Sequence, residues 1–358
     1  MSLVSLDLQN IRIYKHTHLE PNPHLNLVSG SNASGKTTLL EAIHLLGTGR
    51  SFRTMQAEHL RRSENHELSV VGKLVQPSGE IIRLGLSHGV NGRRVSINGQ
   101  EQQQVSNLAL HLPLQIISPD THYEFQQSAK HRRGILDWGL FHVEPGFHAL
   151  WNRYQRVLQQ RNAALKDRGR AQVHHVWDDE LVRTGEKLQE FRIRQIDKLL
   201  PHFESCCLQL LGEKHQVDLV LDAGWHEESG LGESLLHDRD RDRARGFTHS
   251  GPQRADLEII LNGQKSKLSA SHGQHKVLVL ALRLAQISYL LESTGRACCL
   301  LIDDLAAELD SEHRARLSRF LANLSIQIFV TTTDAELIDR EYWPSYKTFH
   351  VKHGMIVS

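Results

Sequence analysis

The fold of this chain is decided by the stretch Gly30-Ser31-Asn32-Ala33-Ser34-Gly35-Lys36-Thr37, which fits the phosphate-loop pattern G-x-x-x-x-G-K-[S/T] in full. An apolar strand is expected just before it, over residues 25–29, and an amphipathic helix directly after it. In such a loop, backbone N–H groups converge on phosphate oxygens and the helix N-terminus adds partial positive charge. The stretch therefore predicts a binding site for ATP or GTP, and the flanking elements argue against a chance Gly-rich turn.

Individual side chains of this loop have expected roles. Lys36 is expected to reach the β- and γ-phosphates, and the Thr37 hydroxyl to take a Mg²⁺ position. We also assign Thr38 and Arg12 to the nucleotide site. ATP and Mg²⁺ are therefore the expected cofactors.

A pair of carboxylates supplies the second half of such a site. Residues 298–302 form a continuous apolar run that ends at Asp303 and Asp304. Ligands of open α/β sheets bind at the carboxyl ends of strands. We therefore assign Asp303 to Mg²⁺, through water, and Asp304 to orienting or deprotonating the attacking water. Alone, the pair is equally well explained as a cap of the following helix, but the phosphate loop in the same chain favours a metal site.

A third segment, Ser271-His272-Gly273-Gln274, stands before a long helical pattern. It reads as a capping box, in which Ser271 is the N-cap and Gln274 follows three residues later. A Ser and a Gly at a helix N-terminus also form an anion site. Because the chain already has a phosphate loop for its own nucleotide, we predict that Ser271, Gly273 and Gln274 contact the γ-phosphate of a nucleotide bound to a second copy.

The chain shows three regions with different patterns. Residues 1–119 read as strands with one helix, and residues 120–245 read as helical, with one helix expected to stop at Pro201. Residues 246–358 return to alternating helices and continuous apolar strands, which are typical of a parallel sheet buried on both faces. We expect an α/β ATPase lobe from residues 1–119 and 246–358, and a helical second lobe from residues 120–245.

The composition excludes several classes of protein. Lys and Arg number 42 and Asp and Glu 41, a net charge of +1, which argues against a nucleic-acid coat protein but allows a local basic patch. No run reaches the roughly 18 uncharged apolar residues of a membrane span, and the N-terminus lacks the pattern of a signal peptide. We expect a cytoplasmic protein with no membrane partner. The 4 Cys form two adjacent pairs without zinc spacing and are expected to be buried, reduced thiols.

These motifs resemble those of known ATPases. The segment S-H-G-Q resembles the signature motif of ABC ATPase heads, and the chain as a whole resembles the RecF family of bacterial recombination and gap-repair proteins. The segments that carry this resemblance lie from end to end, at residues 6–12, 30–43, 47–53, 132–139, 144–147, 160–165 and 251–256. The resemblance implies an ABC-type P-loop ATPase head, with a mixed sheet and an antiparallel β subdomain, plus an inserted helical lobe and no long coiled coil.

The same resemblance implies a function. It implies ATP-dependent dimerisation on DNA, slow DNA-stimulated ATP hydrolysis, and action with RecO and RecR to help load RecA at single-stranded/double-stranded gap junctions. Gln115 stands where the glutamine loop of such heads would contact Mg²⁺ and water. Thr332 stands where a His usually senses the γ-phosphate, and Ala307 replaces the Ser usual in the dimer-contacting loop.

The sequence also offers basic residues for DNA. One helical stretch carries six candidates, Arg153, Arg156, Arg161, Lys166, Arg168 and Arg170. A second group, Arg50, Arg53, Arg61 and Arg62, follows the phosphate-loop helix. Cationic side chains in a groove suit the phosphate backbone, and without a base-reading motif the binding should be independent of sequence. The alternative for the first group is an ordinary solvated helix face.

Two other functions remain open from the residues alone. A cytoplasmic ATPase subunit of a transport or other ABC-type assembly would need a groove for a membrane partner's helix, and we identify no strongly apolar exposed stripe in the helical region. A P-loop kinase or nuclease-linked ATPase would need a further catalytic domain, and a kinase has no use for the Ser271–Gln274 segment.

Overall fold

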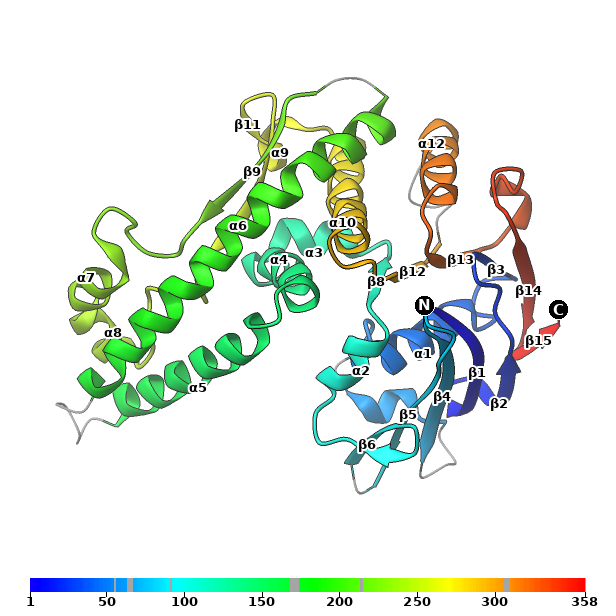
Figure 1. Ribbon diagram of the computed structural model, residues 1–358, viewed down its shortest axis with the longest axis horizontal. Coiled ribbons are helices and arrows are strands. Elements are labelled where there is room, and N and C mark those ends of the chain that lie inside the picture. Colours follow the sequence, from blue (N-terminus) through cyan, green and yellow to red (C-terminus); the bar gives the residue numbers. More distant parts are fainter. Residues whose placement is uncertain are drawn as a thin grey trace. The chain divides into compact units, whose positions relative to one another are not determined.

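The computed structural model describes residues 1–54, 56–62, 67–90, 92–167, 174–212, 215–304 and 310–357. The chain divides into two compact units, residues 1–121 with 290–358, and residues 122–289. Figure 1 shows their helices and strands. The boundary between the units follows residue 121, two residues after the expected boundary at residue 119.

The second boundary differs from the expected one, because residues 246–289 belong to the second unit and not to the ATPase lobe. Strand β10 (Asp256–Leu261) pairs with β9 (Val217–Asp222) of that unit. Within helix α10 (His272–Thr294), the Gln286 amide donates to the Ile135 carbonyl, also in that unit. The return to an α/β pattern in the sequence therefore begins before the chain re-enters the first unit.

The first unit contains a mostly parallel six-stranded sheet in the order β15-β14-β3-β13-β12-β8. Its strands are β3 (Leu25–Ser29), β8 (Leu114–Ile117), β12 (Cys299–Ile302), β13 (Gln327–Thr332), β14 (Tyr346–Lys352) and β15 (Met355–Val357). In register, Ile302 lies beside Val330, and Thr332 beside Ser29. The carboxyl ends of β3, β12 and β13 thus meet at one edge, where the phosphate loop and Asp303 begin.

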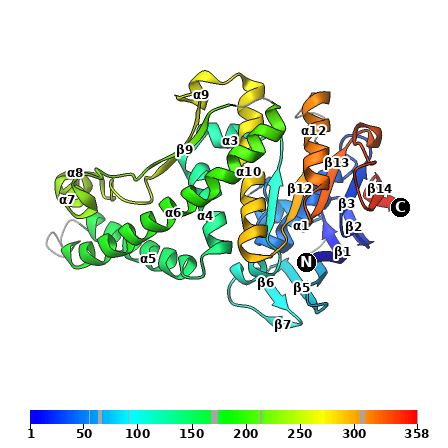
Figure 2. The same ribbon diagram turned by 45° about the horizontal axis from the view of Figure 1, so that its top comes forward.

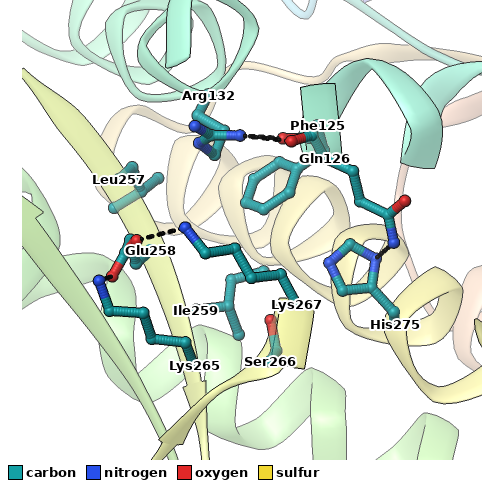
Figure 3. Close-up of a pocket in the computed structure, with 10 residues that line it drawn as sticks. All are labelled: Phe125, Gln126, Arg132, Leu257, Glu258, Ile259, Lys265, Ser266, Lys267 and His275. Carbon is teal, nitrogen blue, oxygen red and sulfur yellow. Dashed lines mark hydrogen bonds and ion pairs between the residues drawn. The ribbon is translucent and has the colours of Figure 1, made fainter. Parts of the chain in front are cut away.

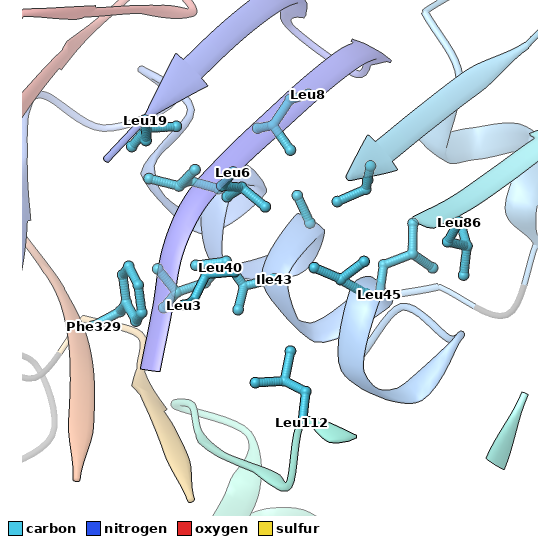
Figure 4. Packing of buried hydrophobic residues seen from close by; sticks show 14 of the residues in the cluster. Leu3, Leu6, Leu8, Leu19, Leu40, Ile43, Leu45, Leu86, Leu112 and Phe329 are labelled. Atoms are coloured by element: carbon cyan, nitrogen blue, oxygen red, sulfur yellow. The ribbon is translucent and has the colours of Figure 1, made fainter. Parts of the chain in front are cut away.

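A second, antiparallel sheet in this unit has the order β2-β1-β4-β5-β6-β7. Its strands are β1 (Ser2–Ile11), β2 (Tyr14–Leu19), β4 (Leu68–Val75), β5 (Ile81–Gly89), β6 (Gly92–Ile97) and β7 (Gln100–Glu101). Helix α1 (Lys36–Thr48) shares one buried cluster with both sheets, in which its Leu40 and Ile43 lie near Leu3, Leu6 and Phe329 (Figure 4). The helix that carries the phosphate loop is therefore fixed by the main core of the unit. The expected mixed α/β head with an antiparallel β subdomain is confirmed.

Four further helical segments lie in the described part of the first unit. They are η1 (Ala57–Leu60), α2 (Ser106–His111), α12 (Ser311–Ala322) and η3 (Ala335–Leu337).

The second unit is mainly helical. Its helices are α3 (Thr121–Gln127), α4 (Ala129–Val143), α5 (Phe147–Lys166), η2 (His174–Trp177), α6 (Asp178–Leu211), α7 (Gly230–His237), α8 (Arg239–Arg245), α9 (Ser266–Ser269) and most of α10, and β11 (Gln264–Lys265) completes a small sheet with β10 and β9. Helices α5 and α6 run side by side (Figures 1 and 2). The longest helix among the described residues is α6, with 34 residues, so they contain no long coiled coil.

Helix α6 does not stop at Pro201, contrary to the expectation from the sequence, but continues to Leu211. A proline inside a helix costs about 3 kcal/mol. The turns that follow bury Phe203, Cys206 and Leu210, and this burial outweighs the local cost. All four cysteines are buried and unbridged, as expected.

One described helix, α10, is long and apolar enough to cross a membrane by length and composition. Of its most apolar 18-residue window, 67% is buried within the molecule. The apolar residues of α10 are therefore explained by its position in the core.

Candidate nucleotide-binding site

The phosphate loop takes a conformation that requires its glycines. Gly30 has φ +152°, and a Cβ there would lie 2.4 Å from the Val351 carbonyl oxygen. Gly35 has φ +119° and caps α1 at its N-terminus. The Gly35 carbonyl accepts a 3.0 Å hydrogen bond from the Tyr14 hydroxyl. Ala33 adopts a left-handed φ of +61°, a conformation that is unfavourable for a residue with a Cβ, so the loop contains one strained residue.

Lys36 is held by the loop that it follows. Its Nζ donates to the carbonyls of Gly30 at 2.7 Å and Ser31 at 2.9 Å. Burial lowers the pKa of Lys36, and the carboxylates of Asp304 and Asp303 oppose that shift. The ammonium therefore lies between the loop carbonyls and the acidic pair, where an anionic phosphate would be stabilised by it.

The acidic pair follows β12, as predicted, and Asp303 joins the loop to the neighbouring strand. Its Oδ1 accepts from the Thr37 hydroxyl at 3.0 Å and from the Thr331 hydroxyl at 2.6 Å. The backbone N–H of Asp304 donates to the same Thr331 oxygen at 2.8 Å. Burial raises the pKa of Asp303, while the two hydroxyl donors lower it.

The structure brings Thr331, rather than the predicted Thr332, to this cluster. The Thr332 side chain is fully buried, and its hydroxyl donates to the Asp334 carbonyl at 2.9 Å. Successive side chains of a strand point to opposite faces, so only one of the two threonines can face the acidic pair. The run Thr331–Thr333 does not reveal which one it is without the register of β13.

These residues surround a cavity of about 450 Å³. It is lined by Arg12, Ile13, Asn32, Ala33, Gly35, Lys36, Thr37, Thr38, Arg53, Asp303, Asp304 and Thr331. Of the other predicted residues, Gly30 and Ser31 contribute their carbonyls to Lys36, and the Ser34 side chain is buried. The hydroxyl and carboxylate oxygens of Thr37 and Asp303 are hard ligands of the kind that Mg²⁺ prefers, so the donor set fits the expected ion.

Gln115 is not among the residues that line the cavity. It lies inside strand β8, opposite Leu300 of β12, and it is 3% exposed. The expected glutamine loop is in fact a strand, because the apolar residues after Gln115 extend the sheet to Ile117. Gln115 therefore does not line the nucleotide cavity, and its contact with Mg²⁺ stays a prediction.

Two further residues, Glu41 and Arg53, support the nucleotide site. Glu41, one turn after Thr37, is fully buried and pairs with Arg12, whose Nε lies 2.6 Å from its Oε2. Arg53 lies 3.7 Å from the same carboxylate, and the Ser51 hydroxyl donates to it. A buried carboxylate requires such partners. A Glu on the apolar face of α1 is therefore a sign, visible in the sequence, that cationic side chains lie nearby. Glu41 orients two guanidinium groups that line the cavity.

The Ser271–Gln274 segment lies in the second unit and forms the predicted capping box. The Ser271 N–H donates to Gln274 Oε1 at 3.0 Å, and the Gln274 N–H donates to Ser271 Oγ at 3.2 Å. Ser271 and Gly273 are exposed, and a Cβ on Gly273 would meet nothing within 4 Å. One turn later, buried His275 contacts Gln126 of α3 (Figure 3), and its burial lowers its pKa. The helix start is thus anchored inside its unit and open on its outer side.

The predicted DNA residues divide into several groups. Arg161 is buried and paired with Asp178 at 2.8 Å and Asp242 at 2.7 Å, so it is a structural residue and not a DNA contact. Its side chain lies on the face of α5 that also buries Tyr154 and Leu165. Arg153 is exposed and paired with Glu180. The exposed residues Arg156 and Lys166 remain candidates, whereas Arg168 and Arg170, like Ala307, lie outside the described residues.

Comparison with known proteins extends these observations. The family model described as the RecF/RecN/SMC N-terminal domain matches residues 2–356. The chain is 40% identical over 357 residues to the DNA replication and repair protein RecF of Thioalkalivibrio sulfidiphilus, and 37% identical over 357 residues to that of Vibrio atlanticus; each match covers 99% of both chains.

Solved structures agree with this result. The structure of the recombination mediator protein RecF-ATPrS in the RecFOR pathway matches with a TM-score of 0.87 and 25% identity, covering 99% of this chain and 97% of that one. An Smc head bound to the C-terminal winged-helix domain of ScpA matches with a TM-score of 0.61 and 14% identity, covering 99% of this chain and 96% of that one, which is a likeness of fold alone.

Proposed function

The chain belongs to the RecF family, and from this membership we propose that it is an ATP-dependent DNA-binding protein of replication and recombinational gap repair. The observation that carries the proposal is the cluster of Lys36, Thr37, Asp303 and Thr331 at the edge where three parallel strands end. A cradle of this kind binds the phosphates of a nucleoside triphosphate. The relatives are named for DNA replication and repair, so a transport ATPase is not retained as an alternative.

The nucleotide site would act through its own residues. Lys36 would bind the β- and γ-phosphates, and Arg12 and Arg53, which also line the cavity and are both oriented by Glu41, would bind the nucleotide as well. Thr37 and Asp303 would hold Mg²⁺, which when bound neutralises phosphate charge. Asp304 would orient the attacking water, and Thr331 would hold Asp303 and Asp304 in register.

Dimerisation completes the proposed site. Ser271, Gly273 and Gln274 would contact the γ-phosphate of ATP bound to a second copy. The Ser271 oxygen accepts from the Gln274 N–H, so its own proton remains available to donate to phosphate. ATP would then join two copies on DNA, slow hydrolysis would separate them, and RecO and RecR would be the partners in loading RecA. Such a protein would be cytoplasmic.

Binding of the protein to gapped duplex DNA, followed by fluorescence anisotropy with ATP and with ADP, tests the proposal. We expect at least tenfold tighter binding with ATP, and loss of that difference in Lys36→Ala. Equal affinity in the two nucleotides, with ATP shown to be bound, would refute the ATP-dependent step.

A further inference from the structure

The first unit contains a second cavity, of about 410 Å³, that shares no lining residue with the nucleotide cavity. The loop that follows α1 forms part of its lining. Its walls are Gly49, Arg50, Ser51 and Thr54 from this loop, together with His88 of β5 and Arg93 of β6. The motif at residues 47–53 therefore faces two cavities, since Arg53 lines the nucleotide cavity and Arg50 lines this one.

The polar wall of this cavity is basic, and none of its described lining residues carries a carboxylate. Arg50 is exposed, and neither it nor Arg93 pairs with a carboxylate of the described residues. Arg93 donates through Nη1 to the Gly49 carbonyl at 2.8 Å, which is one of the five N–H donors of its guanidinium. The buried Nδ1 of His88, the cross-strand neighbour of Arg93, has no hydrogen-bond partner among the described residues. The wall thus offers hydrogen-bond donors that no carboxylate of the described residues accepts from.

The floor of the cavity is apolar. Leu45, Leu60 and Leu86 line it, and each is 4% exposed or less. None of the described lining residues is a Phe, Tyr or Trp, so the cavity lacks the stacking platform that single-stranded bases use. A basic rim above an aliphatic floor suits a phosphate joined to a sugar.

The loop holds Arg50 in place. The Ser51 hydroxyl donates to buried Glu41 and accepts from the N–H groups of Arg53 at 2.9 Å and Thr54 at 3.1 Å. The Thr48 oxygen also accepts from the Arg50 N–H at 3.3 Å. A backbone anchored on both sides of Arg50 reduces the entropy lost when its side chain binds an anion.

We propose that this cavity binds the sugar-phosphate backbone of a DNA strand, with Arg50 and Arg93 on the phosphate and the three leucines against the sugar. The inference rests on the proposed function, because it specifies where a DNA-binding protein of this family would hold its ligand. It adds a contact in the first unit to the exposed Arg156 and Lys166 of the second.

Salt-dependent binding of the full-length protein to a fluorescent gapped duplex, with ATP present, tests the site. We expect Arg50→Ala and Arg93→Ala each to weaken binding about fivefold and to reduce the slope of log K against log salt by about one. The matched control is Arg94→Ala, which removes the same charge from the next residue of β6. Arg94 pairs with Glu67 at 2.9 Å and does not line the cavity, so we expect less than a twofold change.

A filling variant separates the cavity from surface charge. Thr54→Trp keeps both arginines and places an indole in the cavity, and we expect it to weaken DNA binding as Arg50→Ala does. Thermal unfolding of each variant verifies that it is folded, and Arg50, being exposed, is the safest change.

The outcomes are distinct. If the unaltered protein binds DNA but Arg50→Ala, Arg93→Ala and Thr54→Trp bind it with unchanged affinity and salt slope, this site is refuted and the proposed function stands. If the unaltered protein with bound ATP does not bind DNA, both are refuted. A third outcome concerns free phosphate. If millimolar inorganic phosphate removes the difference in DNA affinity between the unaltered protein and Arg50→Ala, while both stay bound to DNA, the cavity takes free phosphate instead and the inference fails.

Discussion

The hydroxyl of Thr331 donates a 2.6 Å hydrogen bond to the carboxylate of Asp303, although the two residues lie 28 positions apart. The same oxygen accepts from the N–H of Asp304, which has a left-handed φ of +52°. One hydroxyl thus fixes both acidic residues at the end of β12. This arrangement makes Thr331 the residue through which strand β13 acts on the nucleotide site.

Replacing Thr331 by Val should therefore lower ATP hydrolysis. We expect about a tenfold decrease in kcat with a smaller change in KM, because the acidic pair loses its alignment while the phosphate loop stays intact. Thr332→Val is the matched control, since the hydroxyl of Thr332 bonds to Asp334 alone among the described residues, and the kcat of this variant should stay within about twofold. If kcat fell further in Thr332→Val than in Thr331→Val, Thr332 and not Thr331 would be the residue that positions the acidic pair.

Asp303→Asn should separate activity from stability. Burial raises the pKa of Asp303, so the folded state binds more protons than the unfolded state in the range above the ordinary carboxyl pKa. Stability contributed by this group therefore falls as pH rises through that range. Without nucleotide, Asp303→Asn should melt at a higher Tm than the unaltered protein at pH 7.5, with a smaller difference near pH 4, and should not hydrolyse ATP. A lower Tm at pH 7.5 would contradict this account.

Glu41→Gln should weaken nucleotide binding without a direct contact to nucleotide. The change removes the charge that holds Arg12 and Arg53, and we expect about a tenfold higher Kd for ATP together with destabilisation of about 3 kcal/mol. The control is Glu67→Gln, which breaks the exposed pair with Arg94 and should change unfolding free energy by less than about 1 kcal/mol. Equilibrium denaturation and titration with a fluorescent ATP analogue measure both quantities.

Ser271→Arg tests the site that a second copy would supply. The larger side chain should fill the space over the helix start, so that ATP binds with nearly unchanged Kd but no longer joins two copies in sedimentation. Ser269→Arg places the same charge two residues earlier, on α9, and should leave dimerisation intact. Normal dimers of Ser271→Arg would remove this segment from the interface.

Arg161→Ala and Arg156→Ala separate structure from DNA contact on one helix. We expect Arg161→Ala to cost about 3 kcal/mol of stability, because fully buried Asp242 would lose its guanidinium partner and keep only His249 among its described partners. Arg156→Ala should leave the Tm unchanged and weaken DNA binding by about threefold. If instead Arg161→Ala weakened DNA binding at an unchanged Tm and Arg156→Ala did not, Arg161 would be a DNA contact, as the sequence predicted.

The sequence predicted the parts of this molecule that depend on local pattern. The phosphate loop, the strand that ends at Asp303 and the capping box at Ser271 each occupy a few consecutive residues, and each forms in the structure. The sequence did not predict features that depend on packing between distant segments. The choice between Thr331 and Thr332 requires the register of β13, and the fate of Arg161 requires carboxylates from α6 and α8.

Gln115 shows the limit of a positional argument. Its place between the β region and the helical region matched a glutamine loop, but the pairing of β8 with β12 turns that position into strand. Glu41 shows the converse, because a charged residue on the buried face of α1 was visible in the sequence, and only the structure identifies its partners.

The central claim is that ATP joins two copies of this chain, each completing the other's nucleotide site. Light scattering of the unaltered protein with ATP and Mg²⁺ tests it most directly. The account predicts a particle of twice the 40.7 kDa mass of the chain with ATP and a monomer with ADP. A protein that binds ATP, keeps the mass of a single chain at every protein concentration, and remains single on gapped DNA would contradict it.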